Sequence, residues 1–188
     1  MEYDDLRIAL ERRKRLMDTR QQKSQMEMTE WNIEEKFSIM APEQAMEVDS
    51  DILKKKYPGS YGNAIVKRML GNEADFRLQF QSSPSCTHEA AVQMRDSIKS
   101  IIMRLQPANT FYSMGTEQSE NNISSWFDFD SFGLDGKIYN FLFFTPLISH
   151  REMVAGGFHC KEKLAVIWKP VFIQMMKSLK ELEIRNEK

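Results

Sequence analysis

The sequence predicts an α+β fold, in which an antiparallel β-sheet of about six or seven strands is packed by two main helices, with an added N-terminal helix. Three observations predict it. Several short segments alternate apolar and polar residues and end at glycine-containing turns, as half-buried strands do. The segment 88–105 instead repeats apolar residues every three or four positions, which is typical of a helix. A second apolar helical pattern closes the chain after Pro170.

Composition is that of an ordinary globular protein. Hydrophobic residues make up 41% of the 188 residues and charged residues 28%, with 26 basic against 27 acidic side chains. This balance gives no strong nucleic-acid signal. No apolar run is long enough for a membrane span, the first residues do not resemble a signal peptide, and only two cysteines are present. We therefore expect a cytoplasmic protein with reduced thiols.

Residues 1–30 predict a charged N-terminal helical extension, followed by a single α+β domain at 31–188. The segment 2–30 has no glycine or proline, and Leu6 and Leu10 begin a thin apolar stripe at helical spacing. Arg12 and Arg13 lie in a basic cluster that is a candidate for contacting a partner or a phosphate group. More often such a cluster is a solvated helix face.

The first half of the domain predicts strands around one short helix. The segment 37–40 predicts a strand that stops at Pro42, and 49–56 predicts a helix. The segments 64–70 and 75–80 flank a glycine-containing turn and predict a hairpin. The second of them alternates apolar and polar residues, so one of its faces is buried and the other is wet.

The helix at 88–105 has the clearest pattern. Thr87 is placed to cap its first turn, where Glu89 adds a negative charge that the helix dipole favours. The predicted buried stripe consists of Ala91, Met94, Ile98, Ile101 or Ile102, and Leu105. This helix is expected to lie on a sheet.

Two aromatic strands are predicted at 123–132 and 137–145, joined by a turn that contains Asp135-Gly136. Adjacent bulky residues such as Phe143-Phe144 point to opposite faces of a strand. Both faces of the sheet are therefore expected to be covered, at least locally.

Further strands are predicted at 111–114 and 153–160. In the second, Gly156-Gly157 indicates a bulge or a close approach of two backbones. Pro170 suits the first turn of the closing helix, where its missing N–H costs nothing. The buried stripe predicted for this helix is Phe172, Met175 or Met176, Leu179 and Leu182.

Three segments carry a resemblance to a known fold. Residues 37–42 (Phe-Ser-Ile-Met-Ala-Pro), the aromatic segment 136–145 and the closing segment 168–179 resemble the first strand, the meander and the last helix of the PsbP-like and DcrB-like α/β sandwich. The resemblance spans 36–184. It implies a non-enzymatic binding scaffold, since members bind proteins as different as a small GTPase and photosystem subunits, and some relatives are chaperones.

A zinc site is the first chemical hypothesis to weigh. Cys86, His88, His159 and Cys160 supply two thiols and two imidazoles, a ligand set that suits tetrahedral zinc. Their spacing argues against it, because adjacent residues on a strand point to opposite faces. We therefore predict no metal, and Cys160 is better interpreted as a small buried apolar residue.

A nucleophilic site is the second hypothesis. Cys86 precedes a helix whose dipole could lower the pKa of its thiol, and His88 is near in sequence. No catalytic signature surrounds this pair, and the glycines form no phosphate-binding loop. The sequence therefore predicts no catalytic residue and no cofactor.

Paired carboxylates are the third hypothesis. Asp128 and Asp130 share one face of a strand, and with Trp126 they could form a small-ligand or hydrolytic site. The simpler interpretation, which we favour, is that both acids lie on the wet face of a strand whose Phe127 and Phe129 are buried.

An aromatic sheet face is the remaining candidate surface. Trp126, Phe132 and Phe144 could exceed what one helix layer covers, and an exposed apolar patch marks an interaction site. Equally, the N-terminal extension could fold back over them. The predicted partner-binding residues are Trp126, Asp128, Phe132, Phe144, Arg12 and Arg13.

These observations favour a non-catalytic protein-binding scaffold, adaptor or chaperone-like protein whose partner is another protein. The first alternative is a small-ligand-binding or hydrolytic protein that uses Trp126, Asp128 and Asp130. The second alternative is a structural subunit of a larger assembly. No feature of the sequence indicates an oligomeric state.

Overall fold

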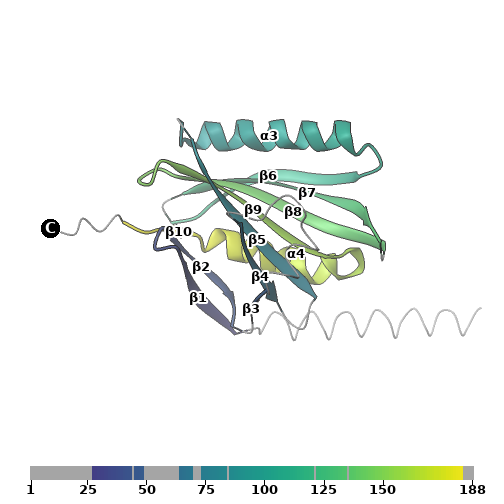
Figure 1. The fold of residues 1–188 in the computed structure, drawn as a ribbon, viewed down its shortest axis with the longest axis horizontal. Helices are drawn as coiled ribbons and strands as arrows, with labels where there is room; N and C mark the ends of the chain where they lie inside the picture. Colours follow the sequence, from purple (N-terminus) through teal and green to yellow (C-terminus); the bar gives the residue numbers. More distant parts are fainter. Residues whose placement is uncertain are drawn as a thin grey trace, which may run out of the picture.

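The computed structural model describes residues 27–43, 45–48, 64–69, 73–83, 85–120, 122–134 and 136–183. Figure 1 shows a layered arrangement: helix α3 (His88–Leu105) lies over one face of a large sheet, and helix α4 (Ala165–Lys177) and a small sheet lie on the other. The α+β class predicted from the sequence is confirmed. Residues 1–26 of the helical extension expected at 1–30, and the helix expected at 49–56, fall outside the described residues.

The large sheet is antiparallel throughout. In the described part of the chain its strand order is β3 (Met46–Glu47), β4 (Ala64–Met69), β5 (Ala74–Ser82), β9 (Glu152–Lys161), β8 (Gly136–Leu147), β7 (Ile123–Gly133) and β6 (Thr110–Gln118). Both predicted hairpins are confirmed, since β4 pairs with β5 and β7 pairs with β8. Strand β6 is much longer than the 111–114 segment expected, because pairing with β7 compensates for its weak apolar alternation.

The small sheet has the order β1 (Met28–Ile33), β2 (Phe37–Pro42) and β10 (Lys180–Glu181). Residues 28–30 therefore belong to a strand, whereas the sequence placed them at the end of a helix. Strand β2 also runs through Pro42 instead of stopping before it. Pro42 pairs only with Met28 of β1, so the N–H that it lacks is not needed by a second neighbour.

Helix α3 has the predicted bounds and cap. The Thr87 hydroxyl accepts a hydrogen bond from the Ala90 amide at 3.2 Å. A buried cluster forms beneath the helix from Ala91, Phe127, Phe129, Phe144 and Met153, with Met94, Ile98 and Ile102 packed against it. Ile101 and Leu105 are exposed, so the buried stripe runs through Ile102 instead of Ile101.

Helix α4 begins at Ala165, directly after the short 3-10 helix η1 (Glu162–Leu164), and not at Pro170 as predicted. Pro170 lies inside the helix and is exposed. The hydrogen bond that it cannot donate is therefore lost on the side that faces water, where the cost is lowest. The helix buries Ile167, Trp168, Val171, Phe172, Met175 and Met176. No helix in the described residues is long and apolar enough to cross a membrane.

The main core lies between the large sheet, α4 and the small sheet. Phe158 of β9 is at its centre, with its ring centroid 4.5 Å from that of Phe172 and 4.8 Å from that of Phe76. Strand β9 keeps an unbroken register through Gly156, so this glycine makes a close approach and no bulge. A Cβ atom at Gly156 would lie 2.1 Å from the Phe143 ring.

We expect Gly156→Ala to lower the free energy of unfolding by about 1–3 kcal/mol, because the new methyl group overpacks a rigid ring. Gly157→Ala is the matched control, since the nearest atom to its new Cβ is the end of the flexible Leu142 side chain. Urea denaturation of the two variants measures the difference. Equal losses would contradict this account of Gly156.

Candidate functional site

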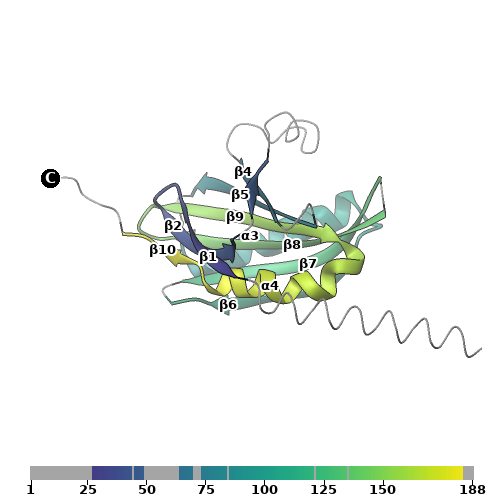
Figure 2. The same cartoon turned by 90° about the horizontal axis from the view of Figure 1, so that it is seen from below.

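A cavity of about 920 Å³ lies between α4 and the sheet, and Figure 2 shows α4 in front of the sheet on this side of the molecule. We call it the α4 cavity. Its lining residues come from β6, β7, β8, η1 and α4: Tyr112, Asp128, Asp130, Tyr139, Glu162, Lys163, Ala165, Val166, Lys169, Pro170 and Ile173.

A β-bulge shapes the sheet side of the cavity. The register of β6 and β7 shifts between Phe111, which pairs with Phe129, and Met114, which pairs with Phe127. Residues 112 and 113 therefore both stand opposite Asp128. Since a bulge redirects side chains locally, both of these residues can reach acids of the same strand face.

Asp128 is the best-connected side chain of the cavity, and it is only 1% exposed. Its Oδ1 accepts hydrogen bonds from the backbone amide and the hydroxyl of Ser113, at 2.7 and 2.8 Å. Its Oδ2 accepts one from the Tyr139 hydroxyl at 2.7 Å and one from Lys169 Nζ at 2.6 Å. Lys169 Nζ also donates to the Ser113 hydroxyl at 2.9 Å.

These contacts determine the protonation state of the Asp128 carboxyl. Burial opposes ionisation of Asp128 and is the largest single influence, but the hydrogen bonds from Lys169, Tyr139 and Ser113 outweigh it and lower the pKa of the carboxyl. Burial and the hydrogen bond to Asp128 raise the pKa of Tyr139. At neutral pH Asp128 is therefore a carboxylate that accepts hydrogen bonds from neutral hydroxyl groups and from one ammonium group.

Asp130 lies two residues further along β7 and is 2% exposed. Its Oδ2 accepts a hydrogen bond from the Tyr112 hydroxyl, while its Oδ1 is buried with no hydrogen-bond partner among the described residues. The hydrogen bond to Asp130, followed by burial, raises the pKa of Tyr112 to about 12. Tyr112 is therefore a permanent donor at neutral pH.

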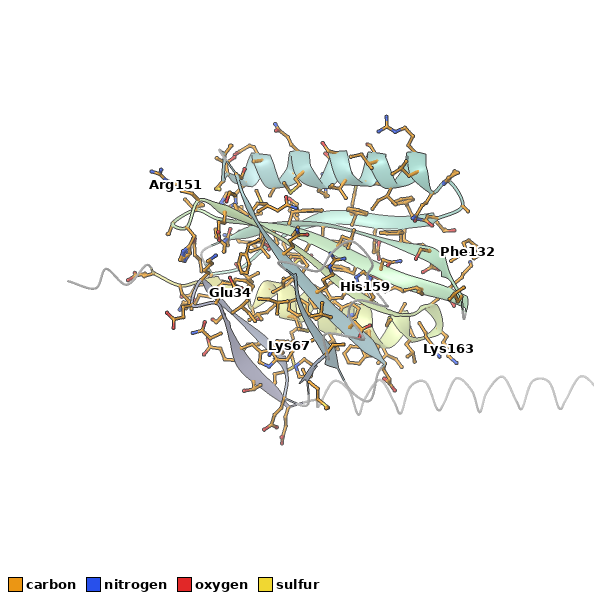
Figure 3. All side chains as sticks on the ribbon, viewed as in Figure 1. Glu34, Lys67, Phe132, Arg151, His159 and Lys163 are labelled. Carbon is orange, nitrogen blue, oxygen red and sulfur yellow. The ribbon has the colours of Figure 1, made fainter. Side chains whose placement is uncertain are left out.

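Exposed apolar side chains stand beside this acidic interior. Tyr112 is 54% exposed and Val166 is 53% exposed, and both line the cavity. Phe132 follows Asp130 on the same strand face and is 65% exposed. Figure 3 places Phe132 and Lys163 toward the same end of the molecule. We call Tyr112, Phe132 and Val166 the cavity rim.

The structure overturns the expectation for the two acids and narrows the candidate aromatic surface. Asp128 and Asp130 do not lie on a wet surface, because α4 covers the face that we expected to be wet. Trp126 and Phe144 are buried, one in the main core and the other beneath α3. Of these three aromatic candidates for an exposed sheet face, only Phe132 is exposed. Arg12 and Arg13 are outside the described residues and stay predictions.

The cysteine and histidine candidates do not assemble into one site. Cys160 belongs to the main core, while the neighbouring His159 ring lies 2.9 Å from the Asn140 amide oxygen and lines a different pocket, next to α3. No cluster of three or more potential metal ligands occurs in the described residues. Burial raises the pKa of the Cys86 thiol and outweighs its hydrogen bonds to Ser83, which is the opposite of nucleophile activation.

The sequence interpretation missed four residues of the candidate site: Tyr112, Ser113, Tyr139 and Lys169. Lys169 was the easiest of them to identify from the sequence, because it is the one charged residue between Ala165 and Gln174 in an otherwise apolar helical segment. Tyr139 pairs with Asp130 across the predicted hairpin, so it could have been placed on the face of the acids. The bulge that brings in Tyr112 and Ser113 has no glycine or other sequence signal.

No protein-family model matches the chain, and no curated protein sequence matches it. Solved structures do resemble it. Cyanobacterial PsbP (CyanoP) from Synechocystis sp. PCC 6803 aligns with a TM-score of 0.59 at 10% identity, over 82% of this chain and 92% of that one. The Ran-binding protein Mog1p of Saccharomyces cerevisiae aligns with a TM-score of 0.52 at 7% identity, over 84% and 97%. The PsbP-like α/β fold predicted from the sequence is therefore confirmed.

We expect Asp128→Asn to lower the free energy of unfolding by about 2–4 kcal/mol at pH 7, because it removes the charge that Lys169 pairs with. Because the pKa of Asp128 is lower in the folded protein than in the unfolded chain, its ionised form stabilises the fold at pH values above the unfolded pKa, about 3.9. The wild type therefore loses this contribution as pH falls from about 5 through the lowered folded pKa, and the variant does not.

Denaturant titrations from pH 7 to pH 3 measure this difference. Glu120→Gln is the control, since it removes the same charge from an exposed pair with Lys180 and is expected to change stability by less than about 0.5 kcal/mol. A pH dependence identical in the wild type and Asp128→Asn would contradict the network.

Cys86 is expected to react with iodoacetamide at pH 7 more slowly than N-acetylcysteine N-methylamide does, because its raised pKa leaves less of it as thiolate. Peptide mapping by mass spectrometry follows the rate and separates Cys86 from the buried Cys160. Labelling faster than the free thiol would restore the nucleophile hypothesis.

Proposed function

We propose that the chain is a non-catalytic protein-binding scaffold, of the adaptor or chaperone-like kind, which docks its partner at the α4 cavity. One observation carries this proposal: Tyr112 and Val166 line the cavity, Phe132 continues the strand face of Asp130, and all three side chains of the cavity rim are more than half exposed. Exposed apolar side chains beside a polar recess are typical of a protein interface, where contacts of this kind exclude water from a central polar anchor.

The charges inside the cavity favour binding over catalysis. A general acid at neutral pH needs a raised carboxyl pKa, whereas the pKa of Asp128 is lowered. A general base needs a lone pair that can reach a substrate, whereas both oxygens of Asp128 already accept two hydrogen bonds each. The hydrolytic alternative with Asp128, Asp130 and Trp126 thus lacks a free catalytic pair, and Trp126 is buried in the core.

The fold supports the same proposal as a prior. Mog1p, which shares this fold, is a Ran-binding protein. Fold likeness at this identity says nothing about which partner this chain takes, so the docking site has to come from the chain's own residues. The cavity rim is the best candidate among the described residues.

Site-specific photo-crosslinking tests the proposal. A benzophenone amino acid replaces Val166 at the rim or, as the control, Met103, which is exposed on α3 across the sheet. In extract of the native source we expect adducts of defined mass from position 166 and none of the same mass from position 103.

Excess unlabelled wild-type protein is expected to compete for those adducts, while excess Val166→Asp protein is not, because a carboxylate disrupts the apolar rim. Adducts that both proteins compete equally, or the absence of adducts at 166, would contradict docking at the cavity.

A further inference from the structure

Of the two buried carboxylates of the α4 cavity, Asp130 has no cationic partner in the described part of the chain. Asp128 is paired with Lys169 at 2.6 Å. Asp130, equally buried, has one hydrogen bond from the neutral Tyr112 hydroxyl and a second oxygen with none. A buried carboxylate is costly unless its charge is paired and its lone pairs accept hydrogen bonds.

The charge balance of the cavity points the same way. Its lining contains three carboxylates and two ammonium groups, which is an excess of one negative charge. Lys169 is committed to Asp128. Glu162 and Lys163 are exposed, so solvent screens them. The unbalanced charge in the interior is therefore that of Asp130.

The complementary group is a cation with N–H donors. An ammonium or guanidinium group would neutralise the carboxylate and donate to the buried Oδ1, and charge-assisted bonds of this kind are the strong ones. The aliphatic stem of such a side chain would lie along the cavity rim, where the Tyr112 ring can also contact the cation.

We propose that Asp130 receives the charged group of a lysine or arginine side chain from the partner protein, an assignment that rests on the proposed function. The rim selects a long side chain attached to a peptide, and the carboxylate selects its positive charge. The Tyr112 hydroxyl occupies Oδ2, so Oδ1 is left for the partner.

The test uses N-acetyl-arginine N-methylamide as the probe and its citrulline analogue, which has nearly the same shape without the charge, as the control ligand. Binding to the full chain is followed by ¹H–¹⁵N NMR titration. We expect the arginine probe to shift the signals of Tyr112, Asp130 and Val166, and to bind about tenfold more tightly than the citrulline analogue.

Asp130→Asn is expected to weaken the arginine probe about tenfold and to leave the citrulline analogue unchanged. Glu120→Gln, which removes one negative charge at the other end of the β6–β7 hairpin, is expected to leave both unchanged. Equal binding of the two probes, or an Asp130→Asn variant that binds like the wild type, overturns the assignment. So does methylguanidine binding as tightly as the arginine probe, because the rim would then contribute nothing.

A second variant covers the case in which Asp130→Asn does not fold. Tyr112→Phe removes the donor to Oδ2 and leaves the charge in place, so the arginine probe is expected to bind about two- to fivefold more tightly. Unchanged or weaker binding overturns the assignment.

The two proposals fail separately. Crosslinked adducts at the rim together with equal binding of the arginine and citrulline probes would support the scaffold proposal and overturn the assignment of Asp130. Arginine preference without rim adducts would leave a cation site and remove the scaffold.

Discussion

The buried carboxylate of Asp128 is the constraint on which the candidate site depends. Four hydrogen bonds from three donor residues converge on it. The donors come from β6, β8 and α4, so one charged group fixes the relative positions of three elements. Such a group is stable in the interior only when its charge is paired and its lone pairs are used. This chain pairs and hydrogen-bonds the buried carboxylate through three features: the β-bulge, the Lys169 side chain, and the position of α4 against the sheet.

The alternation of β7 gives its two faces different chemistry near Asp128. Phe127 and Phe129 pack beneath α3 in an apolar cluster, while Asp128 and Asp130 face the α4 cavity from the same strand. The polar face is tolerated because α4 leaves room there and contributes Lys169. Asp128 takes that cation, and Asp130 is left with only a neutral donor. Because of this difference between the two acids, the buried negative charge that lacks a cationic partner in the described residues is that of Asp130.

Much of the fold could be predicted from the sequence, because it rests on local periodicity. Helix α3, its Thr87 cap and the β7–β8 hairpin follow from the spacing of apolar residues and from the Asp-Gly turn. The start of α4 was misplaced because Pro170 was given its usual first-turn role, whereas it lies on an exposed helix side. Strand β6 pairs with the next strand along the chain, β7, and β1 pairs with β2. Neither β6 nor β1 has a clear apolar alternation of its own, so local propensity did not reveal their extent.

Only part of the candidate site could be predicted from the sequence. The i, i+2 spacing placed Asp128 and Asp130 on one face correctly, but an acidic strand face is usually wet, and only tertiary packing shows that a helix covers it. Asp128 and Lys169 are 41 residues apart, so no sequence window contains both. A double-mutant cycle of Asp128→Asn and Lys169→Met tests their coupling most directly. We predict a coupling energy in unfolding of about 1–3 kcal/mol, and additive effects, within about 0.5 kcal/mol, would contradict this account.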